Sequence, residues 1–114
     1  MVEEAFDSAH ALRGYQGSCE NLHGHTWRVQ AFLSYDKLNN IGIMLDFREI
    51  KSQLKSILDK FDHKNLNDLP EFQKINPSSE NIAKLVYEIL KKKLQYINRI
   101  TVWESQGTWA SYYE

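Results

Sequence analysis

Residues 26–35 read TWRVQAFLSY, which is the clearest strand pattern in the chain. Most of its even-numbered positions are polar, whereas its odd-numbered positions are nearly all apolar: Trp27, Val29, Ala31, Leu33 and Tyr35. An alternation with a period of two is typical of a β-strand that buries one face. Residues 36–40 are rich in turn formers, so we expect the strand to end before them.

Two amphipathic helices are expected after this strand. The first opens at Asp46, which forms a predicted capping box with Glu49, and it ends near Lys60. The second follows Ser78, its predicted N-cap. In both segments the apolar side chains recur at helical spacing, which predicts one buried stripe on each helix.

Three further strands complete the pattern, at about residues 4–9, 99–104 and 109–113. The order strand, strand, helix, helix, strand, strand predicts an α+β domain, in which an antiparallel sheet of four strands carries both helices on one face. A chain of 114 residues has room for one hydrophobic core. We therefore expect a single domain over residues 1–114.

Composition and charge argue against several classes of function. The formal net charge is −1, so no overall positive field would attract nucleic acid. No stretch approaches the roughly 20 apolar residues of a membrane-spanning helix, and the acidic start of the chain is unlike a signal peptide. We expect a cytoplasmic protein without nucleic-acid or membrane partners. The single cysteine, Cys19, has no partner for a disulfide within the chain.

Three histidines form a candidate metal site. His23 and His25 are two residues apart, so in a strand both imidazoles point to the same face, which is also the buried face of residues 26–35. His10 can supply a third nitrogen if the first two strands are hairpin partners. Three histidines with an open fourth position are typical of a catalytic zinc. The alternative is a pair of surface histidines. A bulge at Gly24 would interrupt the alternation that places His23 and His25 on the buried face, and would weaken this prediction.

Four other side chains are candidates for chemistry. A thiol near a divalent cation can act as a base or nucleophile, which points to Cys19, although a lone cysteine is more often inert packing. Asp62 can orient His63 for acid–base work, unless the two belong to an ordinary polar loop. Glu104 ends a strand on its apolar face, where its oxygens would accept from an amidine-like ring edge or else reach solvent.

The order of these motifs along the chain is more specific than any one of them. They are F-x-x-A-H at residues 6–10, C-x-x-x-H-G-H at 19–25, G-x-M-x-D-F at 42–47, D-H-x-x-L-N at 62–67, N-P-S-S-E-N at 76–81, and then Glu104. This order resembles the 6-pyruvoyl-tetrahydropterin synthase and 6-carboxy-tetrahydropterin synthase superfamily over essentially the whole chain.

The resemblance implies a fold, an assembly and a role for each residue. The fold is the tunnelling fold, whose four-stranded antiparallel sheets join edge to edge into a β-barrel, usually as a trimer that pairs into a homo-hexamer. The implied roles are Zn²⁺ binding by His10, His23 and His25, a catalytic thiol at Cys19, a proton relay of Asp62 and His63 from a neighbouring subunit, and anchoring of the pterin ring by Glu104.

The three-residue spacer between Cys19 and His23 resembles the carboxy enzymes of queuosine (7-deazaguanine) biosynthesis. The resemblance then implies a lyase that converts 7,8-dihydroneopterin triphosphate to 6-carboxy-5,6,7,8-tetrahydropterin, acetaldehyde and triphosphate. Two alternatives stay open: a 6-pyruvoyl-tetrahydropterin synthase, and a non-catalytic pterin- or metal-binding paralogue. Arg13, Lys37 and Lys64 are candidates for holding the triphosphate on charge and placement alone.

Overall fold

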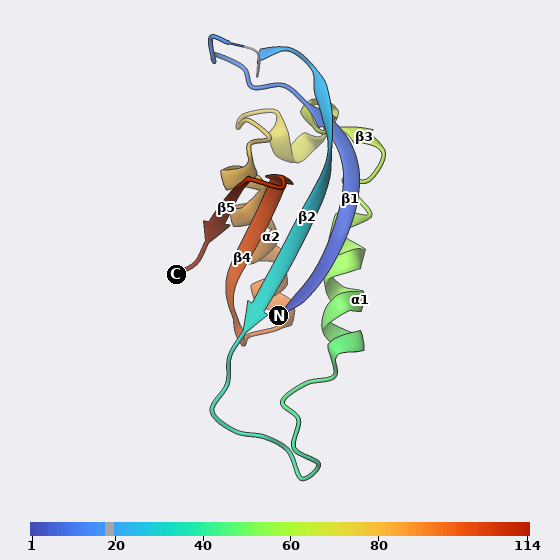
Figure 1. Cartoon of the computed structure of the whole chain (residues 1–114), viewed down its shortest axis with the longest axis vertical. Helices are drawn as coiled ribbons and strands as arrows, with labels where there is room; N and C mark the ends of the chain where they lie inside the picture. Colours follow the sequence, from blue (N-terminus) through green and yellow to red (C-terminus); the bar gives the residue numbers. More distant parts are fainter. Residues whose placement is uncertain (18–19) are drawn as a thin grey trace.

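The computed structural model describes residues 1–17 and 20–114. Its strands are β1 (Val2–His10), β2 (His23–Leu33), β3 (Lys64–Asn65), β4 (Ile97–Ser105) and β5 (Thr108–Tyr112), and its two α-helices are α1 (Phe47–Leu58) and α2 (Ser79–Lys93). The strands form one sheet in the order β3-β1-β2-β4-β5, and both helices lie on one face of it (Figure 1). The predicted α+β class with two helices is confirmed.

The sheet differs from the prediction at one edge. The main strands pair antiparallel, but β3 pairs parallel to β1 at two positions, Ser8↔Lys64 and Ala9↔Asn65, which makes a mixed sheet of five strands. This short strand forms because the chain after α1 returns along the edge of β1, where the His63 N–H donates to the Asp7 carbonyl at 2.7 Å. Two residues carry no period-two signal, so the sequence could not reveal the strand.

The pairing of β1 with β2 positions the candidate site. It runs without interruption from Val2↔Ala31 to His10↔His23 and includes Ala9↔Gly24, so Gly24 introduces no bulge. The period-two alternation of residues 26–35 therefore continues back through His25 and His23, which the prediction of two histidines on the buried face required. Both strands are also longer at this end than predicted, because β1 reaches residue 10 and β2 begins at residue 23.

The hydrophobic core lies between the sheet and the helices. The ring of Phe6 on β1 stacks on that of Trp27 on β2, with centroids 5.8 Å apart and planes within 5°. Fully burying one large apolar side chain contributes about 1.5–3 kcal/mol. The largest of the fully buried apolar side chains are Trp27, Phe61, Phe72, Leu54, Ile57, Leu58, Leu66, Ile82, Leu90, Ile97 and Ile100.

Both helices are capped where the sequence predicts. The Asp46 carboxylate accepts from the Arg48 N–H at 2.8 Å, and the Ser78 hydroxyl accepts from the Asn81 N–H at 3.2 Å. The capping box is only half correct, because the Glu49 carboxylate accepts from the Gln53 amide at 3.3 Å instead. Helix α1 also ends two residues earlier than expected. None of the described helices is long and apolar enough to cross a membrane.

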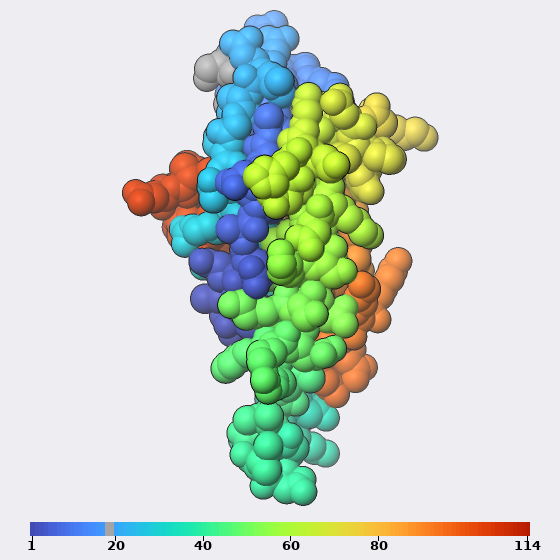
Figure 2. Space-filling view, turned by 90° about the vertical axis from the view of Figure 1, so that its right-hand side faces the viewer, coloured from blue at the N-terminus to red at the C-terminus, as the bar shows by residue number. Residues whose placement is uncertain are grey.

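The molecule is elongated, with extents of 53 × 26 × 24 Å. The connection between β2 and α1 projects from the end that carries the start of β1, while the ends of β1 and β4 and the start of β2 lie toward the other end (Figure 1). Figure 2 shows the same projection below α1. The residues of the candidate site therefore gather at the end of the sheet away from this projection.

Candidate metal centre

The three predicted histidines meet at one end of the sheet, on its helix-covered face. His10 is the last residue of β1 and pairs directly with His23, the first residue of β2, while His25 follows two positions along β2. Glu104, near the end of β4, completes a cluster of four residues whose ligand atoms lie within 4.8 Å of one another. Antiparallel pairing thus brings together residues that are up to 94 positions apart in the chain.

The ring nitrogens that face one another in this cluster are all Nε2 atoms. The Nε2 atoms of His10 and His23 are 3.1 Å apart. The Glu104 Oε1 atom lies 2.9 Å from the His25 Nε2, 3.6 Å from that of His10 and 3.9 Å from that of His23. Four possible ligand atoms therefore converge on one point.

Backbone carbonyls determine where the protons of two of the imidazoles lie. The Nδ1 atom of His10 is 2.7 Å from the Pro77 carbonyl oxygen, and that of His23 is 2.6 Å from the Asn21 carbonyl oxygen. A carbonyl oxygen only accepts, so each Nδ1 must carry a proton. In the neutral imidazoles both Nε2 atoms then present lone pairs to each other, and a cation between them would remove this repulsion. Histidine ligands of metals commonly donate their other ring N–H in this way.

Burial also favours the form of histidine that binds a metal. Desolvation lowers the pKa of His10 and of His25 below 6.5, and the nearby Glu104 carboxylate opposes this only in part. Both imidazoles are therefore neutral at pH 7, as metal coordination requires. The His25 Nε2 is buried and has no hydrogen-bond partner among the described residues. A bound cation would satisfy this orphaned atom, so the four residues fit a metal site.

A hydroxyl that the sequence analysis missed holds the second oxygen of Glu104. The Ser79 Oγ atom donates to the Glu104 Oε2 atom at 3.1 Å, and Ser79 is a buried residue at the start of α2. The Ser78 cap places Ser79 in the first turn of the helix, facing the sheet. The signal was present in the N-P-S-S-E-N motif, where a second serine follows the N-cap.

Asp62 and His63 form a separate cluster with Asp7. The Asp62 Oδ1 atom accepts from the Asp7 N–H at 2.9 Å, and the His63 Nε2 atom is 3.6 Å from the Asp62 Oδ2 atom. The side chain of Asp7 points to the opposite face of β1 from that of His10 because the two are an odd number of residues apart. The His63 side chain is 80% exposed. One chain therefore brings Asp62 and His63 to each other but not to the histidine cluster.

Cys19 and Arg13 are two further residues that the sequence analysis named for the site. Cys19 lies outside the described residues. Arg13 is not a free triphosphate clamp, because its guanidinium group donates to the carbonyl oxygens of Phe72 at 2.7 Å and Asn67 at 3.1 Å. Its backbone also exchanges two hydrogen bonds with the Asn76 side chain, both of 2.9 Å. Arg13 thus ties the segment after β1 to the loop before α2.

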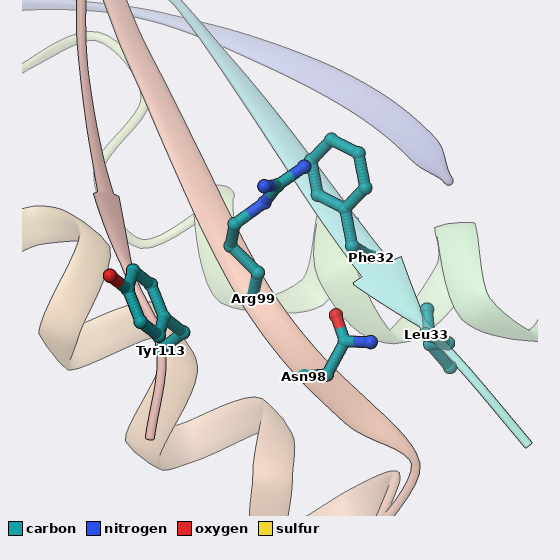
Figure 3. Close-up of a pocket in the computed structure, with 5 residues that line it drawn as sticks. All are labelled: Phe32, Leu33, Asn98, Arg99 and Tyr113. Atoms are coloured by element: carbon teal, nitrogen blue, oxygen red, sulfur yellow. The ribbon is translucent and has the colours of Figure 1, made fainter.

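A shallow pocket of about 480 Å³ lies elsewhere on the sheet, lined by Phe32, Leu33, Asn98, Arg99 and Tyr113. Figure 3 shows the Arg99 guanidinium group beside the Phe32 ring, whose centroid is 4.0 Å away. The pocket residues on β4 are at the start of the strand, whereas Glu104 is near its end. The pocket is thus separate from the histidine cluster.

The fold and the cluster together define a class of protein, an α+β enzyme with a candidate metal centre at one end of its sheet. The chain belongs to the 6-pyruvoyl tetrahydropterin synthase family, whose model matches residues 1–114, and it is a lyase of that family.

Named relatives in this family carry more than one activity. The chain is 33% identical to the 6-carboxy-5,6,7,8-tetrahydropterin synthase of Haemophilus influenzae, with 98% of this chain and 96% of that protein covered. It is 31% identical to the dihydroneopterin monophosphate aldolase of Pyrococcus furiosus, with 91% and 87% covered. The structure of 6-pyruvoyl tetrahydropterin synthase from Caenorhabditis elegans superposes with a TM-score of 0.90 at 25% identity, covering 99% and 92%.

Proposed function

We propose that the chain is a zinc-dependent 6-carboxy-tetrahydropterin synthase. It converts 7,8-dihydroneopterin triphosphate and water to 6-carboxy-5,6,7,8-tetrahydropterin, acetaldehyde and triphosphate, as one step of queuosine biosynthesis. The observation that carries the proposal is the convergence of three Nε2 atoms beside a carboxylate, with two of the rings held by backbone carbonyls. The choice of product rests on the Cys19–His23 spacer and on the similarity to the Haemophilus influenzae enzyme.

His10, His23 and His25 would hold the metal. Three neutral imidazole nitrogens suit Zn²⁺, which prefers nitrogen and sulfur ligands and, in catalytic sites, keeps one position for substrate or water. When bound, Zn²⁺ supplies Lewis-acid polarisation of the side-chain hydroxyls of the substrate.

The remaining residues would bind the substrate and move its protons. Glu104 would accept from the N–H groups at the edge of the pterin ring, in charge-assisted hydrogen bonds. Cys19 would act as the base that moves protons between the ring and the side chain. His63, oriented by Asp62, would be the partner acid or base. Since Asp62 and His63 cluster with Asp7 at the edge of β1 and not with the metal centre, a neighbouring subunit would supply them.

The edges of the sheet support such an assembly. Strand β5 forms one edge of the sheet. At the other edge, the short β3 pairs with β1 only at Ser8 and Ala9, so most of the outer edge of β1 is open. An open edge is a template for pairing with another chain. Repeated β1–β5 pairing between copies would close the sheets into a β-barrel, and the expected assembly is a homo-hexamer formed by two such trimers.

The experiment that tests the proposal is a product assay. Zinc-loaded protein is incubated with 7,8-dihydroneopterin triphosphate, and pterins and acetaldehyde are followed by mass spectrometry. A 6-carboxy-pterin with stoichiometric acetaldehyde is the expected result. A 6-pyruvoyl product without acetaldehyde would assign the chain to the pyruvoyl branch. Substrate binding without turnover would favour the non-catalytic paralogue.

The similarity to the Pyrococcus furiosus aldolase favours a second candidate, cleavage of a dihydroneopterin phosphate. The same assay with 7,8-dihydroneopterin monophosphate separates the two. A hydroxymethyl-pterin released from the monophosphate, with no carboxy product from the triphosphate, would replace the first proposal by the second.

A further inference from the structure

The carboxylate of Glu104 stands where a fourth metal ligand would stand. Two ligand atoms of a tetrahedral zinc with Zn–N distances of 2.0–2.1 Å are about 3.3–3.4 Å apart. The Glu104 Oε1 atom lies 2.9, 3.6 and 3.9 Å from the Nε2 atoms of His25, His10 and His23. The His10 and His23 Nε2 atoms are 3.1 Å apart. These four separations bracket the edge of such a tetrahedron.

Ordinary hydrogen bonds do not explain why the carboxylate is there. In the neutral form that binds a metal, the Nε2 atoms of His10 and His23 present lone pairs to Glu104, because their Nδ1 atoms carry the protons. The His25 Nε2 atom is 2.9 Å from Oε1 but makes no hydrogen bond to it. Ligand atoms that all point toward one cation lie close to one another without the alignment of a hydrogen bond. A shared cation would account for both observations.

The second oxygen of Glu104 is engaged separately, by the buried hydroxyl of Ser79 at 3.1 Å. Partners that orient a metal ligand in this way commonly tune its affinity for the metal. Ser79 also lies in the first turn of α2, where the helix dipole favours a negative charge. The carboxylate is thus held with one oxygen directed at the histidines.

We propose that Glu104 is the fourth ligand of the metal while no pterin is bound, and that a pterin takes this carboxylate away from the metal. The second half rests on the proposed function, in which both oxygens of Glu104 accept from the pterin ring. The same carboxylate cannot serve both partners, so arrival of the pterin opens the fourth coordination position. The position therefore opens only when substrate is in place to use it.

This exchange has a thermodynamic consequence. If the pterin and the metal compete for Glu104, each must weaken the binding of the other by the same factor. A pterin without a side chain isolates the effect, because it has no hydroxyl to bind the metal in place of the carboxylate. Unsubstituted pterin is therefore the appropriate probe.

The first experiment tests the ligand in the absence of any pterin. Glu104→Gln keeps the shape of the side chain and removes its charge. Glu88→Gln is the matched control, because Glu88 is an exposed α2 carboxylate that pairs with Lys84 at 3.9 Å. We expect Zn²⁺ affinity, measured by chelator competition, to fall about 10- to 100-fold or more in Glu104→Gln, since even indirect partners of metal ligands contribute this much. The visible spectrum of the Co²⁺-substituted protein should change as well, and the control should match the unmodified protein.

Unchanged affinity and an unchanged Co²⁺ spectrum in Glu104→Gln would overturn the ligand assignment, whatever the protein does with substrate. Ser79→Ala provides a second variant in case the first fails to fold. It leaves the carboxylate in place but removes the hydroxyl that orients it, so we expect about a 10-fold loss of Zn²⁺ affinity.

The second experiment tests the exchange. Unsubstituted pterin is added to the Co²⁺ protein, and we expect the spectrum to shift toward that of Glu104→Gln and the metal affinity to fall. The Glu104→Gln protein should show no further spectral change. An unshifted spectrum at saturating pterin would overturn the exchange. If pterin does not bind at all, the exchange fails together with the proposed function, while the first experiment still decides the ligand.

Discussion

At the scale of single residues, the chemistry of the centre depends on where the imidazole protons lie. The sequence predicts that His10, His23 and His25 come together, because two strands in register place them on one face. It could not predict the Pro77 and Asn21 carbonyls that hold two of the rings, since these contacts depend on loop conformation. The geometry that suits a metal therefore comes partly from segments with no periodic signal.

Two substitutions separate the proposed metal ligands from the proposed catalytic thiol. We expect His23→Ala to lose Zn²⁺, because one of the three nitrogen ligands is removed. Cys19→Ala should keep Zn²⁺ at full stoichiometry and lose turnover. Metal content by mass spectrometry and product formation measure the two effects. Loss of zinc in Cys19→Ala would make Cys19 a ligand, and full occupancy in His23→Ala would rule out the three-histidine site.

The buried histidines predict how the stability of the metal-free protein depends on pH. The folded-state pKa of His10 and of His25 lies below 6.5, so between that pKa and 6.5 the unfolded chain binds more protons than the folded one. The free energy of unfolding is then highest above pH 6.5 and falls as the pH drops through it. Urea midpoints on both sides of pH 6.5 measure this. The change of the urea midpoint with pH should be smaller in His25→Gln. An equal change in both proteins would contradict the lowered pKa of His25.

At the scale of secondary structure, the sequence was informative wherever a period or a cap was present. The alternation in residues 26–35 predicts β2, and Asp46 and Ser78 predict the starts of both helices correctly. The parallel β3 has only two residues, and its pairing follows from the return of the chain along β1. Such short tertiary pairings cannot be predicted from local pattern.

The turn between α1 and β3 contains a strained residue with a proposed catalytic role. His63 has a φ of 56°, a left-handed conformation that favours glycine. We expect His63→Gly to be more stable than His63→Ala by roughly 0.5–1 kcal/mol, because relief of strain exceeds the entropy that glycine gains on unfolding. Both variants lack the imidazole, so the comparison isolates the backbone.

Chemical denaturation measures this difference, and a position in α1 provides the control. Ser56 is exposed in the helix, where Ser56→Gly should be less stable than Ser56→Ala by about 1 kcal/mol. A His63→Gly protein that is less stable than His63→Ala would contradict the assignment of strain. In that case the left-handed backbone conformation at residue 63 would not be strained.

At the scale of the whole molecule, we propose that two neighbouring chains contribute to each site. The histidine cluster faces the helices, whereas Asp62 and His63 are held by the outer edge of β1. We expect Cys19→Ala and His63→Ala to be inactive alone and to regain activity after subunit exchange. If each site takes one part from each of two neighbours, random mixing restores about one quarter of the sites. No recovery in oligomers shown to be mixed would place both parts in one subunit.

The most direct test of the central claim is a crystal structure measured on both sides of the zinc absorption edge. We expect an anomalous peak about 2.0–2.1 Å from the Nε2 atoms of His10, His23 and His25, present above the edge and absent below it. A protein loaded with zinc that shows no such peak, or shows it away from these histidines, would contradict the proposed metal centre and the function built on it.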